Sequence, residues 1–112
     1  MLNAVIASGA SLSGVIDLTP YNSSGGKRAV GLQMPAAWTA ANLTFFVSLD
    51  GVTFQELYDG QGNEYTVIAN AANYILLDPS VFGSFLWFKI QSGTTASPVN
   101  QAASRTIGIN IG

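Results

Sequence analysis

The sequence contains neither cysteine nor histidine, and each absence excludes a class of chemistry. Without cysteine there are no disulfides, no thiol nucleophile and no thiolate metal ligands. Without histidine there is no Ser-His or Cys-His catalytic pair, no imidazole zinc ligand and no side chain that readily carries protons near neutral pH. We therefore expect a protein that is not an enzyme and that holds no metal or other cofactor.

Charge is also scarce, at 9% of the 112 residues against roughly 25% in an average soluble domain. Hydrophobic residues make up 48%. Because small monomers normally cover themselves with charge, this composition indicates a surface that packs against other protein, including its own copies. The alternative is a monomer with a polar but uncharged surface. The net charge of −2, with only four cations, excludes the basic surface that nucleic acid binding requires.

Long apolar runs are missing as well, and no segment approaches the roughly 20 apolar residues of a membrane-spanning helix. Residues 1–10 carry no Lys or Arg and no continuous apolar stretch, so we expect no secretory signal. The sequence thus predicts a protein without a membrane partner.

Short segments of alternating polar and apolar residues fill the chain instead, separated by turn residues. No helix, linker or repeat interrupts this pattern. Such spacing predicts a single all-β domain over residues 1–112, an antiparallel β-sandwich of jelly-roll type with eight or nine short strands. The predicted strands cover residues 2–7, 12–18, 28–34, 43–48, 52–58, 64–69, 74–77, 85–91 and 105–111.

The clearest element is a β-hairpin over residues 43–58, with Asp50-Gly51 as its turn. The alternation predicts that Val47 pairs with Phe54 and Ser48 with Thr53, whichever turn type forms. It also predicts that Phe45, Val47 and Phe54 point into the core.

Residues 85–91 form the next strongest strand, with Leu86, Phe88 and Ile90 expected on its buried face. Phe85 and Trp87 should then point outward. Two outward aromatic residues beside so little charge would anchor a partner chain. A loop folded over them explains the pattern equally well.

Carboxylates offer two further hypotheses. Asp59 and Glu64 flank a turn and could approach each other as the paired acids of a glycosidase. The same 59–64 loop presents oxygen ligands suited to calcium. A hairpin turn rich in Asp, Gly and Asn accounts for both patterns with no chemistry, and we favour that interpretation.

Two resemblances add to this reading. The hairpin segment 47–54 resembles the Ser-x-Asp-Gly-x-Thr-aromatic turn of discoidin-like and carbohydrate-binding jelly rolls. This likeness implies a second hypothesis, a carbohydrate- or receptor-binding module that stacks sugars on Trp38, Tyr58 or Trp87.

Over nearly its whole length the chain also resembles a family of short proteins from tailed bacteriophages and prophages. The similar segments are residues 6–13, 30–38, 57–59, 77–79, 92–94 and 98–101. This resemblance implies a structural virion protein, with decoration or cementing of the head as its role. The expected partners are the major capsid protein and further copies of the chain, for example in a trimer. The expected location is the capsid surface, after synthesis in the host cytoplasm.

A contact surface for such partners is expected on the outer faces and loops. The 21–28 loop is longer than the resemblance leads us to expect, and it ends in two cations. The candidate interface residues are Phe85, Trp87, Trp38, Lys27, Arg28 and Tyr21.

Overall fold

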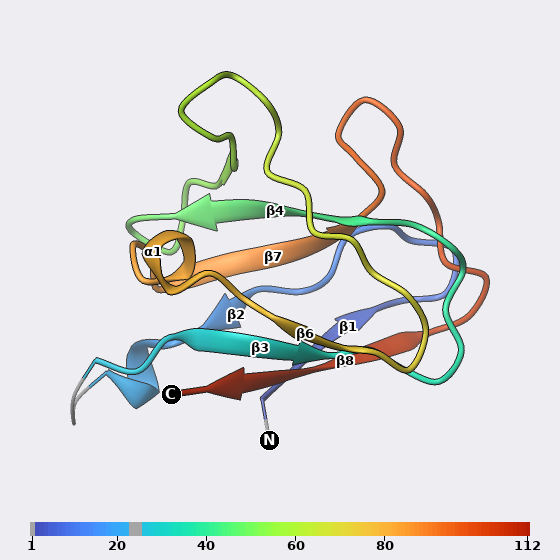
Figure 1. Ribbon diagram of the computed structural model, residues 1–112, viewed down its shortest axis with the longest axis horizontal. Coiled ribbons are helices and arrows are strands. Elements are labelled where there is room, and N and C mark those ends of the chain that lie inside the picture. Colours follow the sequence, from blue (N-terminus) through green and yellow to red (C-terminus); the bar gives the residue numbers. More distant parts are fainter. Residues whose placement is uncertain (1, 23–25) are drawn as a thin grey trace.

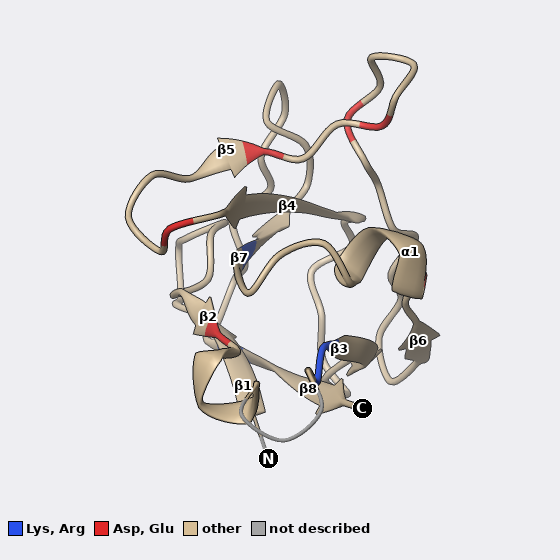
Figure 2. Ribbon diagram, turned by 90° about the vertical axis from the view of Figure 1, so that its left-hand side faces the viewer, with Lys and Arg blue, Asp and Glu red and all other residues tan. Residues whose placement is uncertain are grey.

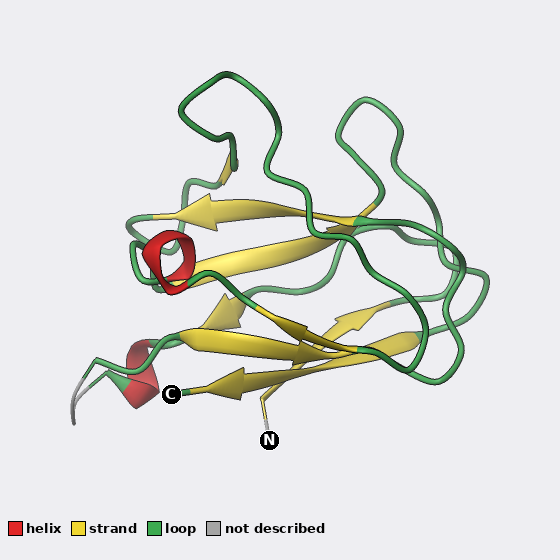
Figure 3. Ribbon diagram, in the orientation of Figure 1, coloured by secondary structure: helices red, strands yellow, loops and turns green. Residues whose placement is uncertain are grey.

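The computed structural model describes residues 2–22 and 26–112, which form two antiparallel four-stranded sheets packed face to face (Figures 1 and 3). Sheet A has the strand order β1-β8-β3-β6 and sheet B has the order β2-β7-β4-β5. The strands are β1 (Leu2–Ile6), β2 (Ile16–Asp17), β3 (Ala29–Gln33), β4 (Leu43–Ser48), β5 (Gln55–Glu56), β6 (Tyr74–Leu76), β7 (Trp87–Ser92) and β8 (Arg105–Ile111). Two short helices join them, the 3-10 helix η1 (Thr19–Tyr21) and α1 (Pro79–Phe82).

The strand order is that of a jelly roll. Four antiparallel pairs make up the two sheets: β1–β8, β2–β7, β3–β6 and β4–β5. The pairing of β3 with β8 completes sheet A, and that of β4 with β7 completes sheet B. Eight strands wound in this way are the double-sheet jelly-roll architecture. The prediction of an all-β antiparallel sandwich is therefore confirmed.

The core lies between the sheets and is centred on aromatic rings. Phe82 of α1 is fully buried, and its ring centroid lies 5.1 Å from that of Phe45, 5.4 Å from that of Phe85 and 6.1 Å from that of Phe88. All three pairs are edge-to-face, the arrangement that the ring quadrupoles prefer. Sheet A supplies aliphatic side chains to the same core, including Ile6, Leu32, Ile107 and Ile109.

The chain enters this core through helix α1. Asp78 caps the helix, accepting a hydrogen bond from the Ser80 N–H at 2.9 Å, and Pro79 occupies the first turn, where no amide donor is needed. The helix thereby places Phe82 in the core, where its side chain is fully buried.

The predicted outward position of Phe85 is wrong, because its side chain is only 4% exposed. Strand β7 begins at Trp87, so the alternation of that strand does not extend back to residue 85. The Phe85 ring instead packs 5.8 Å from Phe88 in the core, and Leu86 is half-buried.

The predicted register of the central hairpin is wrong by one residue. Val47 pairs with Gln55 and Phe46 with Glu56, rather than Val47 with Phe54. The turn at Gly51, with φ +80°, lies inside a longer loop that side chains close. Phe45 is in the core and Val47 packs at its edge, whereas Phe54 is half-buried outside it.

The predicted strand at residues 64–69 forms only two isolated bridges, Leu43 with Val67 and Tyr58 with Glu64. The Glu64 side chain turns away to bond Thr95, and the Thr66 hydroxyl donates to the Glu64 carbonyl. These local bonds compete with a continuous ladder.

Replacing the central ring tests this account of the core. We expect Phe82→Ala to lower the free energy of unfolding by about 3–5 kcal/mol, because it removes buried area and leaves a cavity. Urea denaturation followed by circular dichroism measures the loss. Ile68→Ala, at a position that is 74% exposed, should change stability by less than about 0.5 kcal/mol. Equal losses in the two variants would contradict the central position of Phe82 in the core.

The hairpin loop predicts a pH dependence. Hydrogen bonds from the backbone N–H groups of Thr53 and Val52, and from the Ser48 hydroxyl, hold the pKa of Asp50 below its usual range. Because the pKa in the folded state is below the unfolded value of about 3.9, the ionised carboxylate stabilises the folded protein above that pH. This stabilisation is lost as the pH falls through the folded pKa. We therefore expect the acid limb of stability below about pH 4 to be shallower in Asp50→Asn, measured by denaturation at several pH values; an unchanged slope would refute this.

Candidate functional site

The outer face of sheet B is covered by loops of the chain itself. A Cβ atom at Gly51 would lie 2.9 Å from the Trp87 ring, so the 49–53 loop rests directly on that ring. Next to it, the Lys89 Nζ lies 4.6 Å from the centroid of the Phe54 ring, a cation–π contact. Trp87 is half-buried, and the alternative in which a loop folds over it is confirmed.

The carboxylates of the 59–64 loop are used as structural acceptors. The Asp59 side chain accepts hydrogen bonds from the backbone N–H groups of Asn63, at 3.0 Å, and Gln61, at 2.8 Å, and these bonds lower its pKa. Glu64 accepts bonds from the amide and hydroxyl of Thr95 at 3.0 and 2.6 Å. A catalytic acid needs a raised pKa, whereas the pKa of Asp59 is lowered. Through these hydrogen bonds both Asp59 and Glu64 hold loop segments together. Within residues 2–22 and 26–112 no group of three or more acidic residues could hold a metal ion.

The outer face of sheet A has a different character, because its outward positions are uncharged. The register places Gly31 between Asn110 and Leu76, and Gln33 between Gly108 and Tyr74. In Figure 2, acidic segments appear on β2, on β5 and in the loops beside β4. The outward residues of sheet A are Asn3, Val5, Gly31, Gln33, Tyr74, Leu76, Thr106, Gly108 and Asn110.

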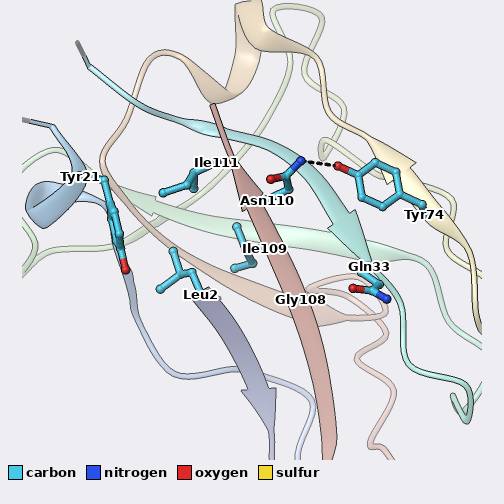
Figure 4. Close-up of a pocket in the computed structure, with 8 residues that line it drawn as sticks. All are labelled: Leu2, Tyr21, Gln33, Tyr74, Gly108, Ile109, Asn110 and Ile111. Atoms are coloured by element: carbon cyan, nitrogen blue, oxygen red, sulfur yellow. Dashed lines mark hydrogen bonds between the residues drawn. The ribbon is translucent and has the colours of Figure 1, made fainter. Parts of the chain in front are cut away.

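A groove of about 340 Å³ is associated with this sheet, and we call it the tyrosine groove. Tyr21 of η1 stands at one end and Tyr74 of β6 at the other, with β8 running between them (Figure 4). The two rings are 37% and 51% exposed. The remaining lining residues are Leu2, Gln33, Gly108, Ile109, Asn110 and Ile111, so none of the lining side chains is charged.

Tyr74 is held across the sheet by its neighbours. Its hydroxyl accepts a hydrogen bond from Asn110 Nδ2 at 2.9 Å, drawn as a dashed line in Figure 4. Its ring lies over Gly31, where any Cβ atom would collide with the ring and its hydroxyl. A second hollow of about 290 Å³ shares Gln33 and Gly108 with the groove and continues it toward Pro35 and Thr106.

The six predicted interface residues do not form one site. Phe85 is in the core, Trp87 lies under the 49–53 loop, and Trp38 is half-buried, with its Nε1 donating to the Ala41 carbonyl at 3.1 Å. Lys27 is exposed, and Arg28 donates to the Asn22 side chain at 2.9 Å. Residues 23–25 of the predicted contact loop lie outside the described residues.

Tyr21 is the one predicted residue that lines the groove. Sequence reasoning missed Tyr74, Gln33 and Asn110, and only Asn110 carried a signal of its outward position. The polar alternate residues of strand 105–111 marked an outer face without charge. The pairing of β3 with β8 on one side and with β6 on the other, which the sequence does not reveal, brings these residues together.

The helices of the described residues, η1 and α1, have three and four residues, and neither meets the length and hydropathy of a membrane-spanning helix.

The position of Tyr74 over Gly31 predicts a measurable coupling. We expect Gly31→Ala to cost about 1–3 kcal/mol of unfolding free energy, because the new methyl group displaces the ring. In a Tyr74→Ala background the same change should cost much less, giving a coupling energy of about 0.5–3 kcal/mol in a double-mutant cycle measured by urea denaturation. Additive effects would show that the ring does not rest on Gly31.

Comparisons of the chain with models of protein families, with curated proteins and with solved structures found no match.

Proposed function

We propose that this protein is a structural, non-catalytic assembly protein that binds other protein subunits through the outer face of sheet A. Its most specific form is a head decoration or cement protein on the capsid surface of a tailed bacteriophage, in contact with the major capsid protein and with its own copies. The observation that carries the proposal is the uncharged outer face of sheet A, with Val5, Tyr74 and Leu76 48%, 51% and 83% exposed.

The size of this face suits a protein partner. The sheets are stacked along the vertical of Figure 1, and across that direction the Cα trace of the whole molecule, with its loops, extends 37 by 24 Å. Sheet A and the loops beside it together form one side of this size. These dimensions are comparable with the roughly 800 Å² that each partner buries in a standard interface. Because the outward positions carry no charge, burying them would leave no unpaired ion to desolvate.

The sheet edges support the same proposal. The edge strands of sheet B carry Asp17 on β2 and Glu56 on β5, and charged residues on edges discourage pairing with another chain. The edge strands of sheet A, β1 and β6, contain no charged residue. Sheet A therefore lacks the usual protection against association on its edges as well as on its face.

Decoration of a shell would work by buried area rather than by chemistry. Each copy would bridge neighbouring shell subunits, so the free energy of the added contacts opposes their separation. The jelly roll recurs in viral capsid domains and also in lectins, and the fold alone therefore does not choose between these roles.

Carbohydrate binding is the second candidate, and the tyrosine groove is the observation that favours it. Tyr21 and Tyr74 offer rings for stacking on a sugar, and Gln33 and Asn110 offer amides that both donate and accept hydrogen bonds. The aromatic residues named from the sequence, Trp38, Tyr58 and Trp87, do not line this groove.

The deciding experiment mixes the purified protein with capsids that lack it and measures co-sedimentation over a range of concentrations. We expect saturable binding. Gln33→Glu should weaken it at least about tenfold, because an unpaired charge in an interface costs more than the 1.4 kcal/mol that corresponds to tenfold.

Gln61→Glu is the matched control, since it makes the same change at an exposed position in the 59–64 loop, away from sheet A. It should bind capsids as the unmodified protein does. A protein that ignores capsids but is retained on a glycan column, with retention lost in Gln33→Glu, would replace the first proposal with the second.

A further inference from the structure

The 49–53 loop projects apolar side chains into solvent. Leu49 is 86% exposed and Val52 is 83% exposed, placing both among the most exposed large hydrophobic residues of the described chain. The loop joins β4 to β5 and lies on the sheet B side of the sandwich (Figure 2). Two such side chains on one short loop form a compact apolar projection.

This projection is held in place by a set of side-chain hydrogen bonds. The Ser48 hydroxyl accepts from the N–H groups of Asp50 and Gly51 at 3.2 and 2.8 Å. Asp50 Oδ1 accepts from the N–H groups of Val52 and Thr53 at 2.8 and 2.9 Å, and from the Ser48 hydroxyl at 2.9 Å. The loop also rests on the Trp87 ring. A loop ordered before binding loses little conformational entropy when it docks.

The tyrosine groove matches this loop in size and polarity. Its volume of about 340 Å³ exceeds the roughly 150 Å³ of an apolar cavity that holds one benzene molecule, so two aliphatic side chains fit. None of its lining side chains is charged, so the apolar side chains of Leu49 and Val52 could be buried there without desolvating an ion.

The charges beside the two elements are also complementary. The one charged residue of the loop is the acidic Asp50. At the groove, Ile111 is followed by Gly112, whose backbone exchanges two hydrogen bonds with Arg28, at 3.1 and 3.0 Å. The exposed Lys27 is next in the chain to Arg28. An acidic loop would thus approach the groove at an end that carries cations.

We propose that the 49–53 loop of one copy inserts Leu49 and Val52 into the tyrosine groove of a second copy. This contact is heterologous, since different surfaces of the two copies meet, and every copy keeps a free loop or groove for the next. The contact therefore repeats, and closes into a ring if the rotation between copies allows. The inference specifies the self-association within the proposed function.

The test compares native masses by light scattering for the unmodified chain and three variants. Leu49→Glu places a charge on the loop and Gln33→Glu places one in the groove, and each should give monomers. Gln61→Glu should keep the mass of the unmodified chain. Circular dichroism checks that each variant is folded.

Mixing the two monomeric variants gives the decisive result. Leu49→Glu retains an intact groove and Gln33→Glu retains an intact loop, so one undamaged contact can form. We expect an equimolar mixture to form dimers and nothing larger. A mixture that stays monomeric, an unmodified chain that is monomeric, or a Leu49→Glu variant that keeps the full mass would each overturn the inference.

The outcome is separable from that of the capsid experiment. A monomeric chain that co-sediments with capsids would overturn this contact and leave the shell-binding role in place. A chain that passes the mixing test but ignores capsids would do the reverse. If Gln33→Glu alters only retention on a glycan column and not the mass, the groove holds a sugar and the proposed contact fails.

Discussion

The packing of Phe82 between the two sheets is the interaction on which the rest of this structure depends. Helix α1 delivers the ring to the point where Phe45 of β4 and Phe88 of β7 face the aliphatic side chains of sheet A. The protein has no cysteine and few charged residues, so burial of apolar surface must supply most of its stability. The loops that cover sheet B and the open face of sheet A are both attached to this core.

The two outer faces of the sandwich differ in accessibility, since loops cover the face of sheet B and the face of sheet A is open. On sheet B the outward ring of Trp87 packs against the 49–53 loop. The polar side chains of that sheet are also paired internally: Gln91 accepts hydrogen bonds from the hydroxyls of Thr44 and Thr95, and Thr95 also donates to Glu64. Sheet A keeps Tyr74 and its neighbours accessible. The few charged residues are unevenly distributed, because four of the six carboxylates lie within residues 50–64, on the sheet B side. The outer face of sheet A, where a partner would bind, is left without charge.

The sequence predicted the architecture well because alternation and turn residues are local signals. It predicted the inward positions of Phe45, Phe88 and Ile90 and the turn at Gly51. It predicted an outward Phe85 wrongly, because the start of β7 depends on where helix α1 ends. It also predicted the hairpin register wrongly by one residue, because hydrogen bonds from the side chains of Ser48 and Asp50 stabilise a longer loop. The tyrosine groove was beyond sequence reasoning: Tyr21 and Tyr74 are brought to one face only by strand pairings between distant segments.

The position of β8 in the centre of sheet A has a consequence for synthesis. Strands β1 and β3 are both neighbours of β8, and Leu2 pairs with Ile109. While a ribosome is still adding residues 105–111, β1 has no partner strand and the β3–β6 pair is half a sheet. Sheet A can therefore form only after translation has passed its last strand, and such distant pairing is slow to find. The uncharged surface proposed for assembly is consequently completed after the last strand of sheet B, β7, has been synthesised.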